Sequence, residues 1–471
     1  MIRVKLLSFF LFGAVSLTCC PPPSAFASSK PTRVHITQGH VKPDPIAFVA
    51  PFSQNSTLKD TSEQFISVVS QDLCNSGVFV PSNPSAFVQD AKSLANSEPR
   101  MQDWRLIKTR FLVCGSIVQE AKGCKLQIRV YDVNRGFKIL AFSVVVCKET
   151  WRTAAHMAAD QIYTRLTGET GMFNTKIAYV EALPAVTKGR RKITYLRRLK
   201  IMDQDGANDR ELTDGTNLVM TPRFSPDGKT IAYLAYRDEG QGRRKKPVAH
   251  VYLMDLATRR QRALLTSEHF DAISRANGGG EVTMTYAPRF SPDGHSVCFS
   301  LIVGGKSAIY AMNIVDGRIR RLTNHMAIDT SPAYSPDGRQ IVFTSDRSGR
   351  EKIYIMNADG SNVRRVTQGD GKYSQPVYSP RGDFIAFAKQ VGNQFFIGVT
   401  RPDGTEERLI VQGYLAEEPS WSPNGRYLVF IWQDRPGRQQ CICKADLTGF
   451  FMQKMNTMRE AKDCSWSPLL K

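Results

Sequence analysis

Pro222-Arg-Phe-Ser-Pro-Asp-Gly228 is the stretch that decides the fold, because it returns five more times along the chain. The copies are Pro288-Arg-Phe-Ser-Pro-Asp-Gly294, Pro332-Ala-Tyr-Ser-Pro-Asp-Gly338, Pro376-Val-Tyr-Ser-Pro-Arg-Gly382, Pro419-Ser-Trp-Ser-Pro-Asn-Gly425 and the truncated Cys464-Ser-Trp-Ser-Pro468. Successive central serines are 66, 44, 44, 43 and 45 residues apart, close to the period of a four-stranded propeller blade. The sequence therefore predicts a β-propeller.

Each repeat has the composition of antiparallel strands joined by tight turns. In Ser-Pro-Asp-Gly the proline presets φ, the aspartate can accept hydrogen bonds within its own turn, and the glycine tolerates a positive φ. A strand rich in β-branched and aromatic residues follows this turn, as at 341–344, and two further strands complete the repeat, as at 353–357 and 364–367. The repeated Asp227, Asp293 and Asp337 are therefore interpreted as turn residues and not as catalytic carboxylates.

Counting strands predicts how the ring closes. The last motif supplies one strand before the chain ends, whereas residues 176–180, 196–203 and 210–213 supply three strands with no first strand ahead of them. Joined in one sheet, these segments make a sixth blade that ties the ring shut and removes its open edges. We predict an all-β six-bladed propeller over residues 176–471, closed by strands from both of its ends.

Two connections within the propeller are longer than their equivalents, from 231 to 251 and from 266 to 288. The antiparallel blade order places both on the same face, and we expect both insertions to lie in loops. Long loops on a rigid scaffold often bind partners, although an insertion without a role is the alternative.

Residues 28–168 lack the repeat and are typical of an α/β domain. Strands are expected at 45–51, 111–118, 126–133 and 139–147, and helices at 61–75 and 151–166, where the apolar residues recur at helical spacing. Gly168 is well placed to end the second helix. Residues 169–175 are expected to link the two domains.

The first 27 residues have the order of a cleaved signal peptide. Arg3 and Lys5 precede an apolar run at 6–17, and Ala25-Phe26-Ala27 supplies the small residues of a cleavage site. Cleavage leaves a mature chain from Ser28 whose residues 28–40 we expect to be flexible; lipid modification at Cys19 or Cys20 is the alternative. Because no later stretch approaches about 20 apolar residues, no transmembrane segment is expected after cleavage.

The net charge of +20 does not indicate a nucleic-acid partner, because the basic residues are scattered over many turns and export separates the protein from nucleic acid. Eight cysteines follow residue 27, and an oxidising compartment permits disulfides among them. Cys441 and Cys443 share one face of a strand, but no second pair follows at the spacing of zinc ligands.

Sequence motifs of catalysis are missing. The chain lacks the Gly-x-Ser-x-Gly nucleophile elbow, its seven histidines form no ligand motif, and no glycine-rich phosphate loop follows a strand. These absences favour binding over catalysis and indicate no metal or other cofactor. A propeller hydrolase, or a propeller that binds ions such as calcium in its central channel, is the alternative.

In combination, these motifs resemble those of the TolB family, the periplasmic propeller proteins of the Tol-Pal cell-envelope system. The junction Leu166-Thr-Gly168 followed by Phe173-Asn-Thr-Lys-Ile-Ala-Tyr-Val180 is similar to the family's, as is the terminal strand Trp466-Ser-Pro-Leu-Leu470. The resemblance implies a monomeric periplasmic scaffold without enzymatic activity that maintains outer-membrane integrity and assists envelope constriction at division. It further implies two partners, a Pal-like peptidoglycan-associated lipoprotein and a TolA-like inner-membrane protein.

The resemblance also implies where these partners bind. A TolA-like protein would contact the mature amino terminus, at Arg33, Val34, His35, Ile36 and Gly39. A Pal-like lipoprotein would contact one face of the propeller, where residues just ahead of each first strand should rim the central channel. The candidates on this rim are Met220, Thr221, Thr285, Tyr286, Asp329, Thr330, Glu417 and Glu418.

Overall fold

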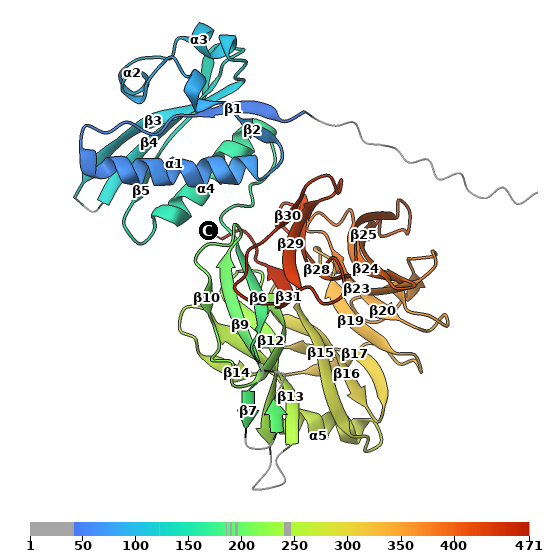
Figure 1. Ribbon diagram of the computed structural model, residues 1–471. Helices are drawn as coiled ribbons and strands as arrows, with labels where there is room; N and C mark the ends of the chain where they lie inside the picture. The colour runs from blue at the N-terminus through green and yellow to red at the C-terminus, as the bar shows by residue number, and fades with distance from the viewer. Residues whose placement is uncertain are drawn as a thin grey trace, which may run out of the picture. The chain divides into compact units, whose positions relative to one another are not determined.

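An α/β domain and a six-bladed β-propeller follow one another along the chain, as the sequence predicted (Figure 1). The computed structural model describes residues 42–470 apart from 122, 185, 189–190, 194–195 and 240–245, and it describes the backbone alone at 186–188, 191–193, 238–239, 246–247 and 283–287. The predicted signal peptide, residues 1–27, and the predicted flexible segment, residues 28–40, lie outside the described residues. Within the described part of the chain, no helix combines the length and the apolar character needed to cross a membrane.

The α/β domain is built on a five-stranded sheet in the order β2-β1-β3-β4-β5. β1 is parallel to β2 and β3, and β3, β4 and β5 form an antiparallel meander. Neighbouring residues of β1 point to opposite faces, so Ile46 packs in the core with α1 and α4, whereas Ala47 packs with Leu94 of α2 and Trp104 of α3. The elements are β1 (Asp44–Phe48), η1 (Ser56–Leu58), α1 (Lys59–Cys74), β2 (Phe79–Pro81), η2 (Pro84–Ala86), α2 (Ala91–Asn96), α3 (Met101–Leu106), β3 (Phe111–Glu120), β4 (Gly123–Asp132), β5 (Phe137–Val146) and α4 (Trp151–Thr167).

The four expected strands and two expected helices of this domain are present, with ends shifted by a few residues. The sequence interpretation missed β2, α2 and α3. Both helices have six residues, which is too short for apolar side chains to repeat at helical spacing. They form because Asp90 caps α2 and because Leu94 and Trp104 are buried against the sheet.

Five blades of the propeller are continuous four-stranded antiparallel sheets. The first strand of each lies innermost, where it contacts the first strands of the two neighbouring blades. The blades are β11 (Leu218–Phe224), β12 (Thr230–Glu239), β13 (Lys246–Asp255) and β14 (Gln261–Ala263); β15 (Val282–Phe290), β16 (Ser296–Val303), β17 (Lys306–Asn313) and β18 (Ile319–Arg321); β19 (Asp329–Tyr334), β20 (Gln340–Ser345), β21 (Lys352–Asn357) and β22 (Arg364–Arg365); β23 (Lys372–Tyr378), β24 (Ile385–Val391), β25 (Gln394–Thr400) and β26 (Arg408–Gly413); and β27 (Leu415–Trp421), β28 (Tyr427–Gln433), β29 (Cys441–Asp446) and β30 (Met452–Lys454).

The sixth blade combines both ends of the propeller, which confirms the predicted closure (Figure 1). Its sheet order is β10-β9-β6-β31, and β31 pairs antiparallel with β6. Its strands are β6 (Lys176–Ala182), β9 (Arg197–Asp203), β10 (Arg210–Glu211) and β31 (Ala461–Trp466), and the small hairpin β7 (Val186–Lys188) and β8 (Arg191–Ile193) lies between β6 and β9.

The repeated motif works as a turn clamp. Ser225 Oγ donates to Asp227 Oδ1 at 2.5 Å and accepts the Thr230 N–H at 2.9 Å, while Asp227 Oδ1 accepts the Lys229 N–H at 3.0 Å. The same contacts surround Asp293 and Asp337, and hydrogen bonds from Ser291 and Ser335 hold the pKa of these two carboxyl groups below the usual value. The turn interpretation of the three aspartates is therefore confirmed.

The closing blade reproduces this clamp without a covalent turn. Ser467 Oγ accepts the Lys176 N–H at 2.9 Å, so Lys176 occupies the place that Thr230 has beside Ser225. Asn174 and Leu470 exchange two further hydrogen bonds, at 2.8 and 3.0 Å. The truncated sixth motif is thus completed by the chain segment that enters the propeller.

The prediction that both insertions lie in loops was wrong. The first insertion lengthens β12 and β13 to 10 residues each, and these strands pair from Thr230 and Asp255 out to Glu239 and Lys246. The second insertion contains helix α5 (Ser267–Ala276), which is anchored by Ile273 against the core of the first two blades. Thr266 and His269 form its capping box. Because a histidine replaces the usual Glu or Gln of this motif, the start of the helix could not be recognised from the sequence.

Candidate functional sites in the propeller ring and at the domain junction

A β-bulge interrupts the first strand of every blade where the strands meet around the ring axis. In five blades the bulged residue has a φ between 45° and 56°, a backbone conformation that residues other than glycine rarely adopt. These residues are Thr221, Ser331, Gln375, Glu418 and Asp463. Such strain costs about 1–3 kcal/mol per residue and persists only where surrounding contacts fix it.

Side chains at the bulges connect different blades. Gln375 Nε2 donates to Glu418 Oε1 at 2.9 Å, and Gln375 Oε1 accepts the Glu418 N–H at 2.8 Å. Arg223 donates to the Glu418 carboxylate and, at 3.1 Å, to the carbonyl oxygen of Cys464. The Thr221 N–H donates to Asp463 Oδ2 at 3.3 Å. This bulge ring therefore links the first, fourth, fifth and sixth blades directly.

Acidic groups dominate this part of the ring. Burial raises the pKa of Asp463 to about 6, and the nearby Glu418 adds to the effect while Arg197 and Arg223 oppose it. Burial also raises the pKa of Glu417, and the charges of Glu418 and Asp463 raise it further. Close carboxylates in a poorly hydrated setting make a surface that favours a basic or hydrogen-bond-donating partner.

The structure places the eight predicted rim residues on four of the inner strands. Met220, Thr330 and Glu417 are half-buried, whereas Thr221 and Glu418 are almost buried in the bulges. Asp329 is fully buried, and both of its carboxylate oxygens accept hydrogen bonds from Arg347 Nη2, each at 3.0 Å. On β15, Thr285 pairs with Leu301 and Tyr286 with Ser300. The five candidates at the amino terminus, Arg33, Val34, His35, Ile36 and Gly39, lie outside the described residues.

The sequence interpretation omitted three members of the bulge ring, Ser331, Gln375 and Asp463. Gln375 precedes Pro376 as Thr221 precedes Pro222, and Asp463 holds the equivalent place in the truncated repeat. Ser331 likewise precedes Pro332, so aligning all six repeats on that position would have found all three.

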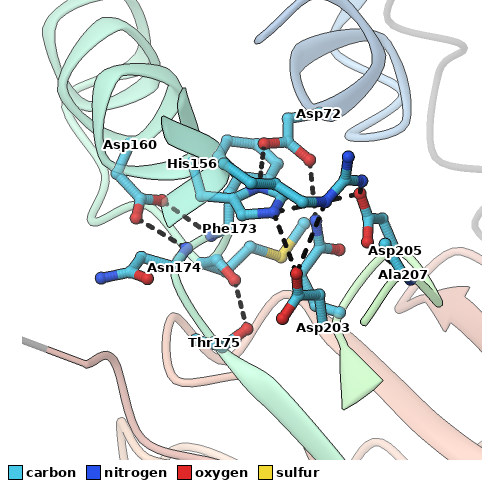
Figure 2. A network of polar contacts seen from close by, with 12 residues as sticks. Asp72, His156, Asp160, Phe173, Asn174, Thr175, Asp203, Asp205 and Ala207 are labelled. Atoms are coloured by element: carbon cyan, nitrogen blue, oxygen red, sulfur yellow. Dashed lines mark hydrogen bonds and ion pairs between the residues drawn. The ribbon is translucent and has the colours of Figure 1, made fainter. Parts of the chain in front are cut away.

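A second polar cluster lies where the α/β domain meets the propeller, within one compact unit, Val41–Lys471 (Figure 2). The Nδ1–H group of His156 on α4 donates to Asp72 Oδ2 of α1 at 2.6 Å, and the Nε2 atom of His156 lies 3.8 Å from Asp203 Oδ2 of the propeller. Gln204 Nε2 donates to Asp72 Oδ1 at 2.8 Å. His156 is therefore held between a carboxylate of each domain.

Further charged groups complete this junction network. Arg152 of α4 pairs with Asp205 and lies 3.5 Å from Asp203, and Lys176 also pairs with Asp203. Lys444 on β29 is buried; burial lowers its pKa to about 8, although Asp72 and Asp205 act in the opposite direction. The network thus sets the carboxylates of Asp72, Asp203 and Asp205 among basic groups from both domains.

Asp72, His156 and Asp205 bring three potential metal-ligand atoms within 4.8 Å of one another. Both Asp72 oxygens and His156 Nδ1 already take part in hydrogen bonds, and Arg152 pairs with Asp205. Most of these ligand atoms are therefore engaged within an ion-pair network, although His156 Nε2 makes no hydrogen bond within the described residues, so we interpret the arrangement as a structural joint.

Helix α4 also fixes the linker, residues 169–175, between the two domains. Asp160 of α4 accepts the N–H groups of Phe173 and Asn174 at 2.7 and 2.9 Å (Figure 2). Gly171 passes so close that a Cβ there would lie 2.7 Å from Asp160 Cα, which only glycine avoids. Met172 and Phe173 are buried in the core that the two domains share.

The junction should make stability depend on pH. Burial alone would lower the pKa of His156, but the Asp203 and Asp72 carboxylates outweigh it and, with Asp205, raise the pKa to about 9. Below pH of about 6.5 both the folded and the unfolded chain hold this proton; above it the unfolded chain releases the proton first. His156 should thus stabilise the fold by about 3 kcal/mol at pH 6, and this contribution should disappear as pH rises through about 9.

Urea titrations of the wild-type chain and of His156→Asn between pH 6 and 10 test this expectation. The comparison between the two chains cancels the opposing titration of Lys444. A free-energy difference that stays constant across this range would contradict the ion-pair assignment.

Comparison with known proteins agrees with this architecture. Residues 32–139 match the TolB amino-terminal domain family and residues 163–470 match the TolB beta propeller domain family. The Tol-Pal system protein TolB of Paramagnetospirillum magneticum is 43% identical over 237 residues, which are 49% of this chain and 49% of the relative; the match thus spans about half of the relative's length. The crystal structure of TolB from Acinetobacter baumannii matches with a TM-score of 0.75 and 27% identity, covering 90% of this chain and 97% of that one.

Proposed function

The chain belongs to the TolB family, and from this membership we propose that it is a periplasmic binding scaffold of a Tol-Pal system and not an enzyme. The observation that carries the proposal is the presence of both family domains in one chain, in the order amino-terminal domain and then propeller. A closed ring tied to a second domain by a buried linker is a rigid platform, which suits a protein that presents surfaces to other proteins.

Two partners follow from this proposal. A Pal-like peptidoglycan-associated lipoprotein would bind the propeller at the bulge ring, and a TolA-like inner-membrane protein would bind residues 33–39. Joining these partners would help to maintain the outer membrane and to draw in the envelope at division. The acidic character of the ring supports a partner surface that is basic or rich in hydrogen-bond donors.

Among the rim candidates, we assign direct contact to the half-buried Met220, Thr330 and Glu417. Glu418 and Asp329 are held by Arg223 and Arg347, so we assign them to fixing the shape of the ring. Glu417 lies near the carboxylates of Glu418 and Asp463 and forms no ion pair within the described residues that a substitution would break, and it is therefore the residue to test.

Affinity capture with the mature chain tests both partners at once. We expect a chain that begins at residue 41 to lose the TolA-like partner and keep the Pal-like lipoprotein. Glu417→Lys should do the reverse, weakening the lipoprotein at least tenfold through like charge and lost hydrogen bonds. Glu149→Lys, an equal charge change at an exposed position of the α/β domain, is the matched control and should keep both partners. Capture of neither partner by the folded mature chain would refute the proposal.

A further inference from the structure

Two thiols face each other on the third strand of the fifth blade. Cys441 and Cys443 are two residues apart on β29, so both side chains point to the same face, and their sulfur atoms lie 3.8 Å apart. The eight cysteines within the described residues are all free thiols. From this juxtaposition we propose that Cys441-Ile442-Cys443 is a redox-active dithiol that exchanges with small-molecule or protein disulfides.

Cys441 is the thiol that would react first. It is 5% exposed, it is the first residue of β29 and it follows the exposed segment 434–439, whereas Cys443 is 0% exposed. Lys454 faces Cys443 across the β29–β30 pair and brings a positive charge to the same place. A hydrogen bond from Cys443 and the charge of Lys454 outweigh burial and lower the pKa of Cys441 to about 7.

The other buried thiols have the opposite chemistry. Burial raises the pKa of Cys114 to about 11, and it raises the pKa of Cys298 and Cys464 still further. A thiolate is the form that attacks a disulfide, so these three thiols should stay inert while Cys441 reacts. The contrast distinguishes Cys441 from the cysteines that only fill the core. The hydrogen bond with Cys441 and burial raise the pKa of Cys443, so Cys443 is the thiol that reacts second.

The exchange proceeds in two balanced steps. The Cys441 thiolate attacks one sulfur of a disulfide RSSR, the S–S bond breaks, and a mixed disulfide forms as RS⁻ leaves. Cys443 then passes its proton to the departing thiolate and attacks Cys441 Sγ, which forms the Cys441–Cys443 bond and expels the second RS⁻. The second RS⁻ takes up the proton that Cys441 released to solvent when it ionised, so that overall the dithiol loses two electrons and two protons and RSSR becomes two RSH.

The product should be readily reduced again. Residues i and i+2 of a strand have Cα atoms about 6.6–6.8 Å apart, at the upper end of the usual range for a disulfide. A bond formed at that limit is strained, and strained disulfides are the labile ones. Both thiols lie in the core between the fourth and fifth blades, on the face of β29 opposite to Lys444.

Trypsin offers a direct test, because Arg438 and Lys444 bound a peptide, residues 439–444, that holds both cysteines. The reduced, folded mature chain is exposed to oxidised glutathione, alkylated and digested. We expect this peptide to be lighter than the dithiol form by two hydrogen atoms and to resist alkylation, while Cys298 remains a thiol. An unreacted dithiol, a glutathione adduct that persists on Cys441, or a bond from either residue to another cysteine would overturn the proposal.

Variants separate the two roles. Cys443→Ser should stop the reaction at a glutathione adduct on Cys441, and Cys441→Ser should leave Cys443 unmodified. Cys443→Ala removes the hydrogen bond that stabilises the thiolate and should slow alkylation of Cys441 about tenfold at pH 7. Cys298→Ser is the matched control, with an unchanged 439–444 peptide; a melting curve for each variant shows that it is folded. If Cys443→Ala alkylates as fast as the wild type, the assigned role of Cys443 is wrong.

Discussion

Trp466→Ala is expected to lower the free energy of unfolding by about 3–5 kcal/mol, because it removes the largest side chain of the strand that closes the ring. Trp466 is 5% exposed and packs in the core shared by the sixth blade and the α/β domain. Its Nε1 donates to Thr175 Oγ1 at 2.8 Å, across the seam between β31 and β6. The substitution thus leaves a cavity and removes a hydrogen bond across the seam, at the place where no covalent turn holds the blade together, while the Thr175 hydroxyl still donates to the Met172 carbonyl oxygen at 2.7 Å.

Urea denaturation with two further variants identifies the cause. Trp466→Phe keeps most of the buried ring area but removes the indole N–H, so it should lose only part of that free energy. Met458→Ala, at a residue 86% exposed just before β31, should change stability by no more than about 0.5 kcal/mol. If Trp466→Ala were as stable as Met458→Ala, the closing strand would not contribute to holding the ring shut.

The blade count and the closure could be predicted because both depend on features that repeat. Ser225, Ser291 and Ser335 each sit in a turn of the same chemistry, so the spacing between them measures one blade. The fourth repeat shows that the turn tolerates change, since Arg381 replaces the aspartate and Asp383 takes over the hydrogen bond from Ser379 at 2.5 Å. Because more than one sequence can form this turn, the spacing of the repeats can still be recognised where single motif residues are replaced.

The junction network could not be predicted in the same way. Asp72 and His156 lie 84 residues apart, and 132 residues separate Asp72 from Gln204. In the sequence His156 is one of seven scattered histidines, and its role arises only from the docking of α1, α4 and the turn after β9. Contacts of this kind depend on tertiary placement, for which a single sequence has no period or spacing.

Asp72→Ala is the second substitution expected to have a large effect, again about 3–5 kcal/mol of unfolding free energy. Asp72 is 1% exposed, and its two carboxylate oxygens accept hydrogen bonds from His156 and Gln204. Its removal leaves two buried polar groups without their acceptor and takes a negative charge away from His156 and Lys444. Breaking a buried pair from one side is costly because the remaining charge stays desolvated.

Glu63→Ala on the same helix is the matched control, since its side chain is 57% exposed and lies 3.9 Å from Lys59. Such a surface pair contributes at most about 1 kcal/mol. The decisive measurement is a double-mutant cycle with Asp72→Asn and His156→Asn, in which we expect a coupling free energy of about 1–3 kcal/mol. Additive effects of these two substitutions would show that the residues are neighbours without being partners. Coupling in that range would instead make the contact between α1 and α4 part of what fixes the α/β domain to the ring, because the same histidine also faces Asp203 of the propeller.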